Sequence, residues 1–226
     1  MDATQRNFMD TMMYPKIEAV QAPYYAGDAA YRTPPPDLPS LLLKERIVYL
    51  GMPLVPAVSE LIIAELLYLQ YDDPDKPIKI YINSIGTLGF ETDAFAICDT
   101  LSYIKPPVHT ICIGSAVGMA ALLLASGTPG FRASLPNSKI VLQQPQSAAR
   151  GQATDIQIQA QEVLRNKEAT VNLFAKKTGQ DPDRISKDMN RRFYMTPPEA
   201  KEYGIIDTVL APNSPAAKPL AGSGIG

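Results

Sequence analysis

The chain has 226 residues, of which 46% are hydrophobic and 19% are charged, and its formal net charge is −2. This length suffices for one substantial domain with appendages, and the composition is typical of a soluble protein with a large core. No Lys/Arg run favours nucleic acid or an anionic membrane, and no apolar run reaches the about 20 residues that span a bilayer. The two cysteines, Cys98 and Cys112, lie in apolar stretches, which predicts buried thiols in a reducing compartment.

The two ends of the chain differ in composition from the middle. Residues 1–36 hold Tyr, Met and Pro without periodicity and finish in a proline run, so we expect an extended arm. Residues 211–226 are low in complexity, and we expect a disordered tail. The N-terminal stretch lacks the features of a signal or transit peptide, which favours a cytoplasmic protein, or a plastid stromal one if a targeting sequence has been removed.

Between residues 37 and 210, candidate strands and helices alternate. A glycine-containing loop, NSIGTLGFETD, follows the second strand. Repeated β-α-β order implies parallel strands joined by right-handed crossovers, so the fold class is α/β. We predict strands over 46–51, 78–83, 108–113 and 139–144, and helices over 59–70, 94–104 and 118–126.

The longest predicted helix follows the last of these strands. Thr154 and Gln157 predict a capping box at its start, and Gly179 predicts its end. Some 24 residues give a length of about 36 Å, with apolar positions on more than one stripe. Either it is a core helix with a broad apolar face, or it leaves its domain and buries a second face on another subunit. Shorter helices are predicted in DPDRISKDM and TPPEAKEYG, the latter with a capping box of Thr196 and Glu199.

The stretch ICIGSAVGMAALLLASG predicts a buried strand, a tight turn and an apolar helix, the arrangement by which serine hydrolases present a nucleophile. The turn residue is Gly118, which has no nucleophile, and Ser115 falls three positions too early. The single histidine, His109, lies six residues before Ser115, about 20 Å away along a strand. Hydrolysis by Ser115 would need the strand to end early, so we interpret both residues as structural.

Six motifs, in order and over about residues 40–210, resemble the Clp protease proteolytic subunit family, and within it the degenerate ClpR chains of cyanobacteria and plastids. The resemblance implies a crotonase-like spiral of β-α-β units in residues 37–210. It also implies a protruding handle helix, about 154–177, which joins two seven-membered rings. The motifs are LLLKERIVYLG, IKIYINSIG, ICIGSAVGMAALLLASG, LPNSKIVLQQP, GQATDIQIQAQEVL and EAKEYGIIDTVL.

The resemblance also assigns the catalytic positions. Gly118 stands where the family has its nucleophilic serine, Gln143 where it has the histidine base, and Arg192 where it has the acidic residue. None of these replacements can perform the chemistry of the residue it replaces. The resemblance therefore implies an inactive structural or regulatory subunit in mixed heptameric rings with catalytic Clp protease subunits, although the assembled complex would be a serine endopeptidase. It implies no metal and no cofactor.

Two further sets of positions follow from the resemblance. Met119 and Thr87 match oxyanion-hole positions, although the loop after Thr87 is two residues longer than expected. Tyr81 and Tyr103 match aromatic residues that receive loops of the AAA+ unfoldase, whereas Lys79 departs from that aromatic pattern, as does Ala133. Core tyrosines would give the same sequence signal, so the docking role is left open. No nucleic acid or membrane partner is implied.

The sequence leaves two questions open, namely the role of the N-terminal arm and the choice between two functions. The arm, residues 1–36, would lie near the axial pore, where it either gates entry and binds the unfoldase or is only a flexible tail. The competing function is a crotonase-like enzyme, which shares the spiral fold and binds acyl-CoA thioesters through two backbone N–H groups. The handle helix has no purpose in such an enzyme, which argues for the protease subunit.

Overall fold

Seven strands form one sheet in the computed structural model, which describes residues 37–87, 91–148 and 150–211. The predicted arm and all but the first residue of the predicted tail lie outside the described residues. The hydrogen-bonded order is β1-β2-β3-β4-β7, with β5 paired to the end of β3 and β6 paired to β5. The strands are β1 Ile47–Leu50, β2 Ile78–Ser84, β3 Val108–Val117, β4 Arg132–Ser134, β5 Lys139–Leu142, β6 Phe193–Met195 and β7 Thr208–Val209.

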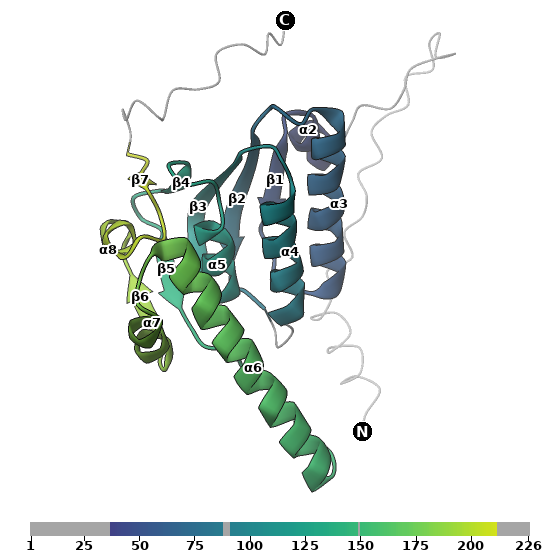
Figure 1. Ribbon diagram of the computed structural model, residues 1–226. Coiled ribbons are helices and arrows are strands. Elements are labelled where there is room, and N and C mark those ends of the chain that lie inside the picture. The colour runs from purple at the N-terminus through teal and green to yellow at the C-terminus, as the bar shows by residue number, and fades with distance from the viewer. Residues whose placement is uncertain (1–36, 88–90, 149, 212–226) are drawn as a thin grey trace, which may run out of the picture. The chain divides into compact units, whose positions relative to one another are not determined.

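Helices join these strands, and three of them, α3, α4 and α5, lie on one face of the sheet (Figure 1). The helix α6 runs away from the rest of the domain, and its buried residues, Thr170, Val171 and Phe174, all lie in its C-terminal half. The helices are α2 Leu38–Lys44, α3 Pro56–Asp72, α4 Glu91–Tyr103, α5 Met119–Ala125, α6 Ala153–Thr178, α7 Pro182–Met189 and α8 Pro197–Tyr203.

The strand pairing confirms the predicted α/β class. All pairs from β1 to β5, and the pair of β4 with β7, are parallel; β6 runs antiparallel to β5. Four elements were not predicted, namely α2, β4, β6 and β7. The three strands among them have only two or three residues, too few for an alternating pattern to be visible in the sequence.

The helix ends test the predicted caps. The capping box of Thr154 and Gln157 is wrong, because α6 begins at Ala153 and its N-cap is Gln152, two residues before Thr154, with no side-chain cap. Gly179 ends α6 in the left-handed conformation, with φ of 75°. The box at α8 is confirmed, because Glu199 accepts a hydrogen bond from the backbone N–H of Thr196 at 2.7 Å.

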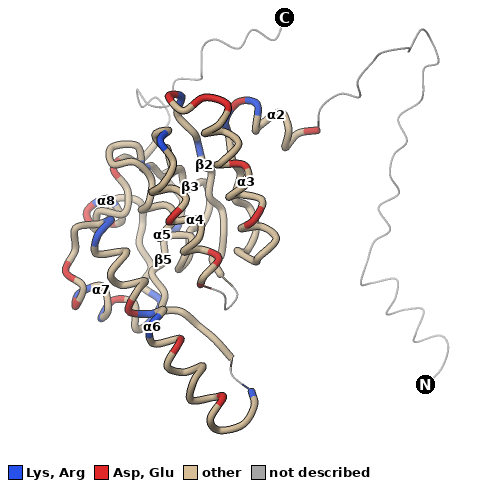
Figure 2. Tube along the Cα trace, turned by 45° about the vertical axis from the view of Figure 1, so that its right-hand side comes forward, with Lys and Arg blue, Asp and Glu red and all other residues tan. Residues whose placement is uncertain are grey.

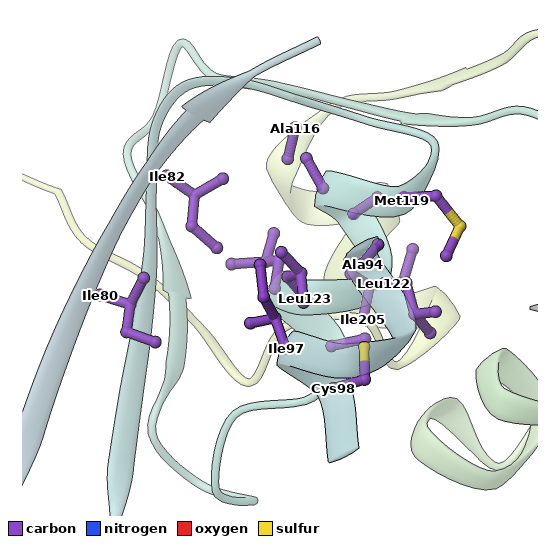
Figure 3. Close-up of a cluster of buried hydrophobic side chains, with 14 of the residues drawn as sticks. Ile80, Ile82, Ala94, Ile97, Cys98, Ala116, Met119, Leu122, Leu123 and Ile205 are labelled. Atoms are coloured by element: carbon purple, nitrogen blue, oxygen red, sulfur yellow. The ribbon is translucent and has the colours of Figure 1, made fainter. Parts of the chain in front are cut away.

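The core lies between the sheet and the helices that cover it (Figure 3). Every residue of α5 is buried, and Leu122 of this helix meets Ile82 of β2 and Ile97 of α4 in one cluster. Cys98 and Cys112 are both free and buried, as predicted. Burial raises the pKa of the Cys98 thiol to about 11, so this thiol is unreactive at neutral pH.

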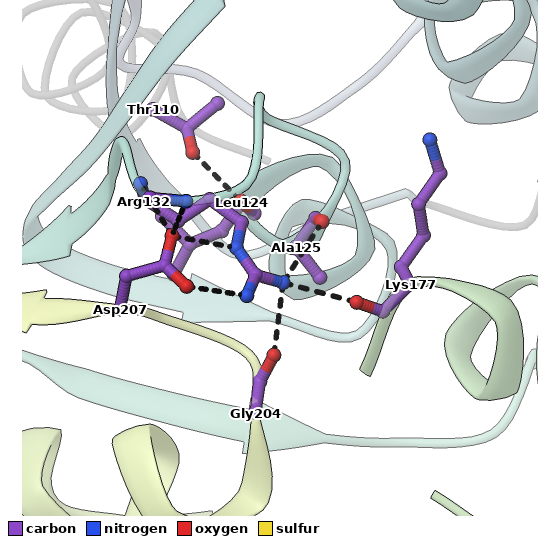
Figure 4. Close-up of polar contacts among 8 residues, drawn as sticks. Thr110, Leu124, Ala125, Arg132, Lys177, Gly204 and Asp207 are labelled. Atoms are coloured by element: carbon purple, nitrogen blue, oxygen red, sulfur yellow. Dashed lines mark hydrogen bonds and ion pairs between the residues drawn. The ribbon is translucent and has the colours of Figure 1, made fainter. Parts of the chain in front are cut away.

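A buried arginine fixes the base of α6 to the sheet (Figure 4). The Arg132 guanidinium on β4 forms an ion pair with Asp207, with 2.6 Å between Nη2 and Oδ1. Its Nη1 donates to the carbonyl oxygens of Lys177 at 3.0 Å and Gly204 at 2.9 Å. These carbonyls belong to the ends of α6 and α8, where the helix itself supplies no partner, so one side chain joins three elements.

Candidate active site

A sharp turn between β3 and α5 forms the centre of the candidate site. Gly118 has φ of 55° and ψ of −113°, a conformation that L-residues rarely adopt. Its N–H donates to the carbonyl oxygen of Val141 on β5 at 2.8 Å. Because β3 and α5 are both anchored in the core, the turn has the sharp, positive-φ geometry by which serine hydrolases expose a nucleophile.

The space beside Gly118 is open. A Cβ built on this residue would lie 3.8 Å from its nearest neighbours, Cβ and the carbonyl oxygen of Gln143. A side chain therefore fits by volume, and only the positive φ opposes it. Gly86, with φ of 85°, is different, because a Cβ there would collide with the carbonyl oxygen of Val117. This glycine allows the end of β2 to pack closely against the turn.

Four of the predicted site residues line one pocket, namely Thr87, Gly118, Met119 and Gln143. They come from three separate parts of the chain: the end of β2, the β3–α5 turn and the segment after β5. Met119 begins α5, and its sulfur lies 3.8 Å from the hydroxyl of Thr170 on α6. The turn is thus in direct contact with the buried base of the long helix.

Gln143 and Arg192 lie at the end of the β5–β6 ladder. The ladder finishes with Leu142 opposite Phe193, so Gln143 and Arg192 follow as the next residues on the two strands. The side-chain oxygen of Gln143 is buried and has no hydrogen-bond partner in the described part of the chain. Arg192 is exposed and does not line the pocket, so it lies at the edge of the site.

Glu91, which the sequence did not suggest, also lines this pocket. It is the first residue of α4 and only 4% exposed. Burial raises the pKa of its carboxyl, and the backbone N–H groups of Glu91 and Gln146 partly oppose that rise. The longer loop was a visible signal in this segment, but a glutamate in a loop is usually exposed, so its burial could not be foreseen.

Ser115 and His109 are not brought together. The strand β3 continues from Val108 to Val117, with a shift in its register against β2 between Cys112 and Ala116, so the two residues stay six positions apart on one strand. Ser115 donates from its N–H to the side-chain oxygen of Asn83 at 3.0 Å. The His109 ring stacks on Phe131 with 4.2 Å between centroids. Both have structural contacts, and His109 cannot act as a base for Ser115.

Tyr81 and Tyr103 lie on different sides of the sheet. Tyr81 is half-buried on β2, and its neighbours Ile80 and Ile82 face the helices, so Tyr81 points to the other face. Tyr103 ends α4 and is 76% exposed. Within one chain, these two tyrosines therefore do not lie in the same pocket.

Among the described residues no group of three His, Cys, Asp or Glu side chains is placed to hold a metal. Basic residues are scattered over several elements rather than gathered on one face (Figure 2). None of the helices in the described ranges is both long and apolar enough to cross a membrane.

The structure defines an α/β protein of crotonase-like fold, with a parallel-dominated sheet, a sharp glycine turn between a buried strand and a buried helix, and a projecting helix. The chain belongs to the Clp protease family, which it matches over residues 35–213. The chain is 60% identical over 225 residues to a "Putative ATP-dependent Clp protease proteolytic subunit-like" protein of Synechococcus elongatus, covering 92% of this chain and 98% of that protein.

Two other relatives have different names. The "ATP-dependent Clp protease proteolytic subunit 2" of Gloeobacter violaceus is 57% identical over 84% of this chain and 87% of its own length. The "ATP-dependent Clp protease proteolytic subunit-related protein 4, chloroplastic" of Arabidopsis thaliana is 49% identical over 90% of this chain and 68% of its own length. The names of these relatives thus include a proteolytic subunit, a subunit-like protein and a subunit-related protein.

Proposed function

We propose that this chain is a catalytically inactive subunit of an ATP-dependent Clp protease core, where it shares mixed heptameric rings with catalytic subunits. The observation that carries the proposal is the β3–α5 turn: its sharp, positive-φ backbone is present, yet the residue on it is Gly118. A glycine offers no oxygen or sulfur to attack a peptide carbonyl. The turn therefore serves the fold, not catalysis.

The neighbouring positions support the same conclusion. The Gln143 amide cannot accept a proton near neutral pH, and the exposed Arg192 guanidinium cannot orient or stabilise a histidine cation. Loss of a serine-protease triad lowers turnover on the order of 10⁶-fold, leaving about 10³–10⁴ over water. This remaining activity would be useless for cutting polypeptides. Met119 and Thr87 remain beside Gly118 as the remnant of an oxyanion hole.

The long helix supports a role in assembly. Only the C-terminal half of α6 packs on the domain, and its other half leaves Ile156, Ile158 and Leu164 exposed at 42%, 65% and 65%. Apolar residues on a projecting helix favour burial against another subunit. We propose that α6 joins two rings and that Tyr81 and Tyr103 of the chain contribute to docking of a Clp-family AAA+ unfoldase, each from its own side of the sheet.

Native mass spectrometry of the protein, purified gently from its own cells, tests the proposal. A particle of about fourteen subunits that contains this chain and a catalytic paralogue is the expected result, and the masses give the ratio of the two. A trimer or hexamer of this chain alone would contradict the proposal. Acyl-CoA binding would then be measured, because that result favours the crotonase-like alternative.

A serine-reactive phosphonate probe tests inactivity separately. In the mixed particle the probe should label the catalytic paralogue and leave this chain unlabelled. Labelling of this chain that disappears in Ser115→Ala would show residual hydrolytic activity and overturn the assignment.

A further inference from the structure

One face of the sheet has no helix on it among the described residues, and its side chains lie in two rows across the strands. In β1, β2 and β3 alternate residues are buried beneath the helices, and the residues between them are half-buried or exposed. The strand register places Tyr49, Tyr81, Ile111 and Ala133 side by side in the first row. This row is apolar and aromatic.

The second row lies two residues nearer the start of each strand. It contains Ile47, Lys79 and His109, again in register. Phe131 extends the row, because its ring stacks on His109 at an interplanar angle of 5°. Two residues of strand separate the rows by about 6.6 Å. Neither row contains a carboxylate.

Lys79 is the only permanent charge in the two rows. It forms no ion pair with any described residue. Burial and the nearby Lys79 ammonium both lower the pKa of His109, so the imidazole is neutral at pH 7 and acts as an apolar ring. The face thus combines an aromatic surface, with Tyr49 52% and Phe131 50% exposed, and one positive charge without a partner.

We propose that this face prefers a particular kind of partner segment. The preferred segment places an apolar side chain over the Tyr49–Ala133 row and a carboxylate beside Lys79. The inference rests on the proposed docking function and names the chemistry of the docking partner. In an extended segment, side chains two residues apart share one face and are about 6.6 Å apart, which matches the row spacing. The partner loop therefore carries an apolar residue and an acidic residue separated by one position.

Charge complementarity sets the specificity of such a contact more than its strength. The apolar row is common to any hydrophobic loop, whereas Lys79 favours an acidic loop and disfavours a basic one. Because Lys79 is near the surface, its effect is moderate and decreases with salt. An unfoldase with a basic docking loop would therefore bind this subunit less tightly than one with an acidic loop.

Binding of two fluorescein-labelled peptides to the full-length chain, followed by anisotropy, tests the inference. The peptides are Gly-Glu-Ser-Leu-Ser-Glu-Gly and the same sequence with Lys in place of both Glu, so either chain direction can place a charge beside Lys79. At low salt the acidic peptide should bind about fivefold more tightly. The difference should vanish in Lys79→Gln, reverse in Lys79→Glu and persist in Lys139→Gln, the control at the exposed first residue of β5.

The Tyr81→Ser variant separates the two levels of the proposal. If both peptides bind wild type equally and both lose binding in Tyr81→Ser, the face is a docking site but the role of Lys79 is refuted. If neither peptide binds, docking on this face is refuted together with its specificity, while the mixed particle seen by mass spectrometry would stand. Circular dichroism of each variant confirms that the sheet is intact.

Discussion

At the scale of single residues, Gly118 separates the geometry of a catalytic turn from its chemistry. The turn depends on hydrogen bonds and packing of its neighbours, such as the bond from Gly118 N–H to Val141, and these do not require a serine. Glycine adopts the positive φ without strain, whereas an L-residue there loses about 1–2 kcal/mol. Replacement of the nucleophile by glycine therefore removes chemistry and relieves strain in one step.

The variant Gly118→Ser should not be a peptidase. A serine side chain fits beside Gln143, but the amide of Gln143 cannot take its proton and no histidine is among the residues that line the pocket. We expect no cleavage of a fluorogenic peptide above that of Gly118→Ala, and both variants should lose about 1–2 kcal/mol of unfolding free energy. Cleavage by Gly118→Ser alone would show that the site holds a base that we have not recognised.

Glu91 should make the stability of the chain fall as pH rises. Its folded-state pKa lies above the unfolded value of about 4.3, so the folded state holds a proton that the unfolded state releases. Stability is greatest below the unfolded pKa and falls as pH rises through the raised pKa. Urea denaturation of Glu91→Gln between pH 4 and pH 7 should lack this fall.

Glu199 is the matched control for Glu91, because the backbone N–H of Thr196 lowers its pKa. Its contribution is present above the unfolded pKa and is lost as pH falls through the lowered value. The Glu199→Gln variant should therefore change the pH dependence in the opposite direction. The same pH dependence in both variants would contradict the assignment of a raised pKa to Glu91.

At the scale of elements, what could be predicted depended on local pattern. The long strands and helices were visible because alternation or helical periodicity extends over several residues, as in β2 and α6. The turn at Gly118 is likewise local. Gln143 and Glu91 reach the pocket only through tertiary packing of β5 and α4, and the sequence alone contains no measure of that packing. Without the family resemblance, Gln143 would not have been singled out.

The Arg132 network should contribute strongly to stability at the junction of β4, α6 and α8. In Arg132→Met two helix-end carbonyls lose their partner, and the Asp207 carboxylate loses the guanidinium and keeps only the backbone N–H groups of Gly130 and Arg132. Breaking a buried pair costs about 3–5 kcal/mol. Arg165→Met is the control, because Arg165 forms only an exposed pair with Glu162 on α6, worth about 0–1 kcal/mol. Equal losses in urea denaturation would show that the buried network adds nothing.

At the scale of the whole molecule, α6 is firmly held at one end and uncovered at the other. Phe174 is fully buried and Arg132 binds the last turn, whereas the residues from Ala153 to Gln161 are exposed along the whole helix surface. An isolated domain gains little from nine exposed helical residues. The arrangement is explained if a second subunit supplies the contacts that this domain does not.

The double variant Ile158→Lys with Leu164→Lys tests that explanation without disturbing the domain. Both side chains are 65% exposed, so the unfolding free energy of the chain should change by only about 0.5 kcal/mol per site. Two buried lysines without partners would prevent association of α6 with a facing ring. In native mass spectrometry the particle of about fourteen subunits should give way to one of about seven.

The control raises the charge of the helix by the same amount on another face, in Gln159→Lys with Glu162→Gln, both at exposed positions. If this control also halves the particle, net charge on α6 rather than its apolar residues governs assembly. If neither variant changes the mass, the exposed apolar residues of α6 do not hold the rings together. The projecting helix is connected to ring pairing if the large particle is lost in the apolar variant and kept in the control. The two variants then have the same stability and the same added charge, so only the apolar residues differ.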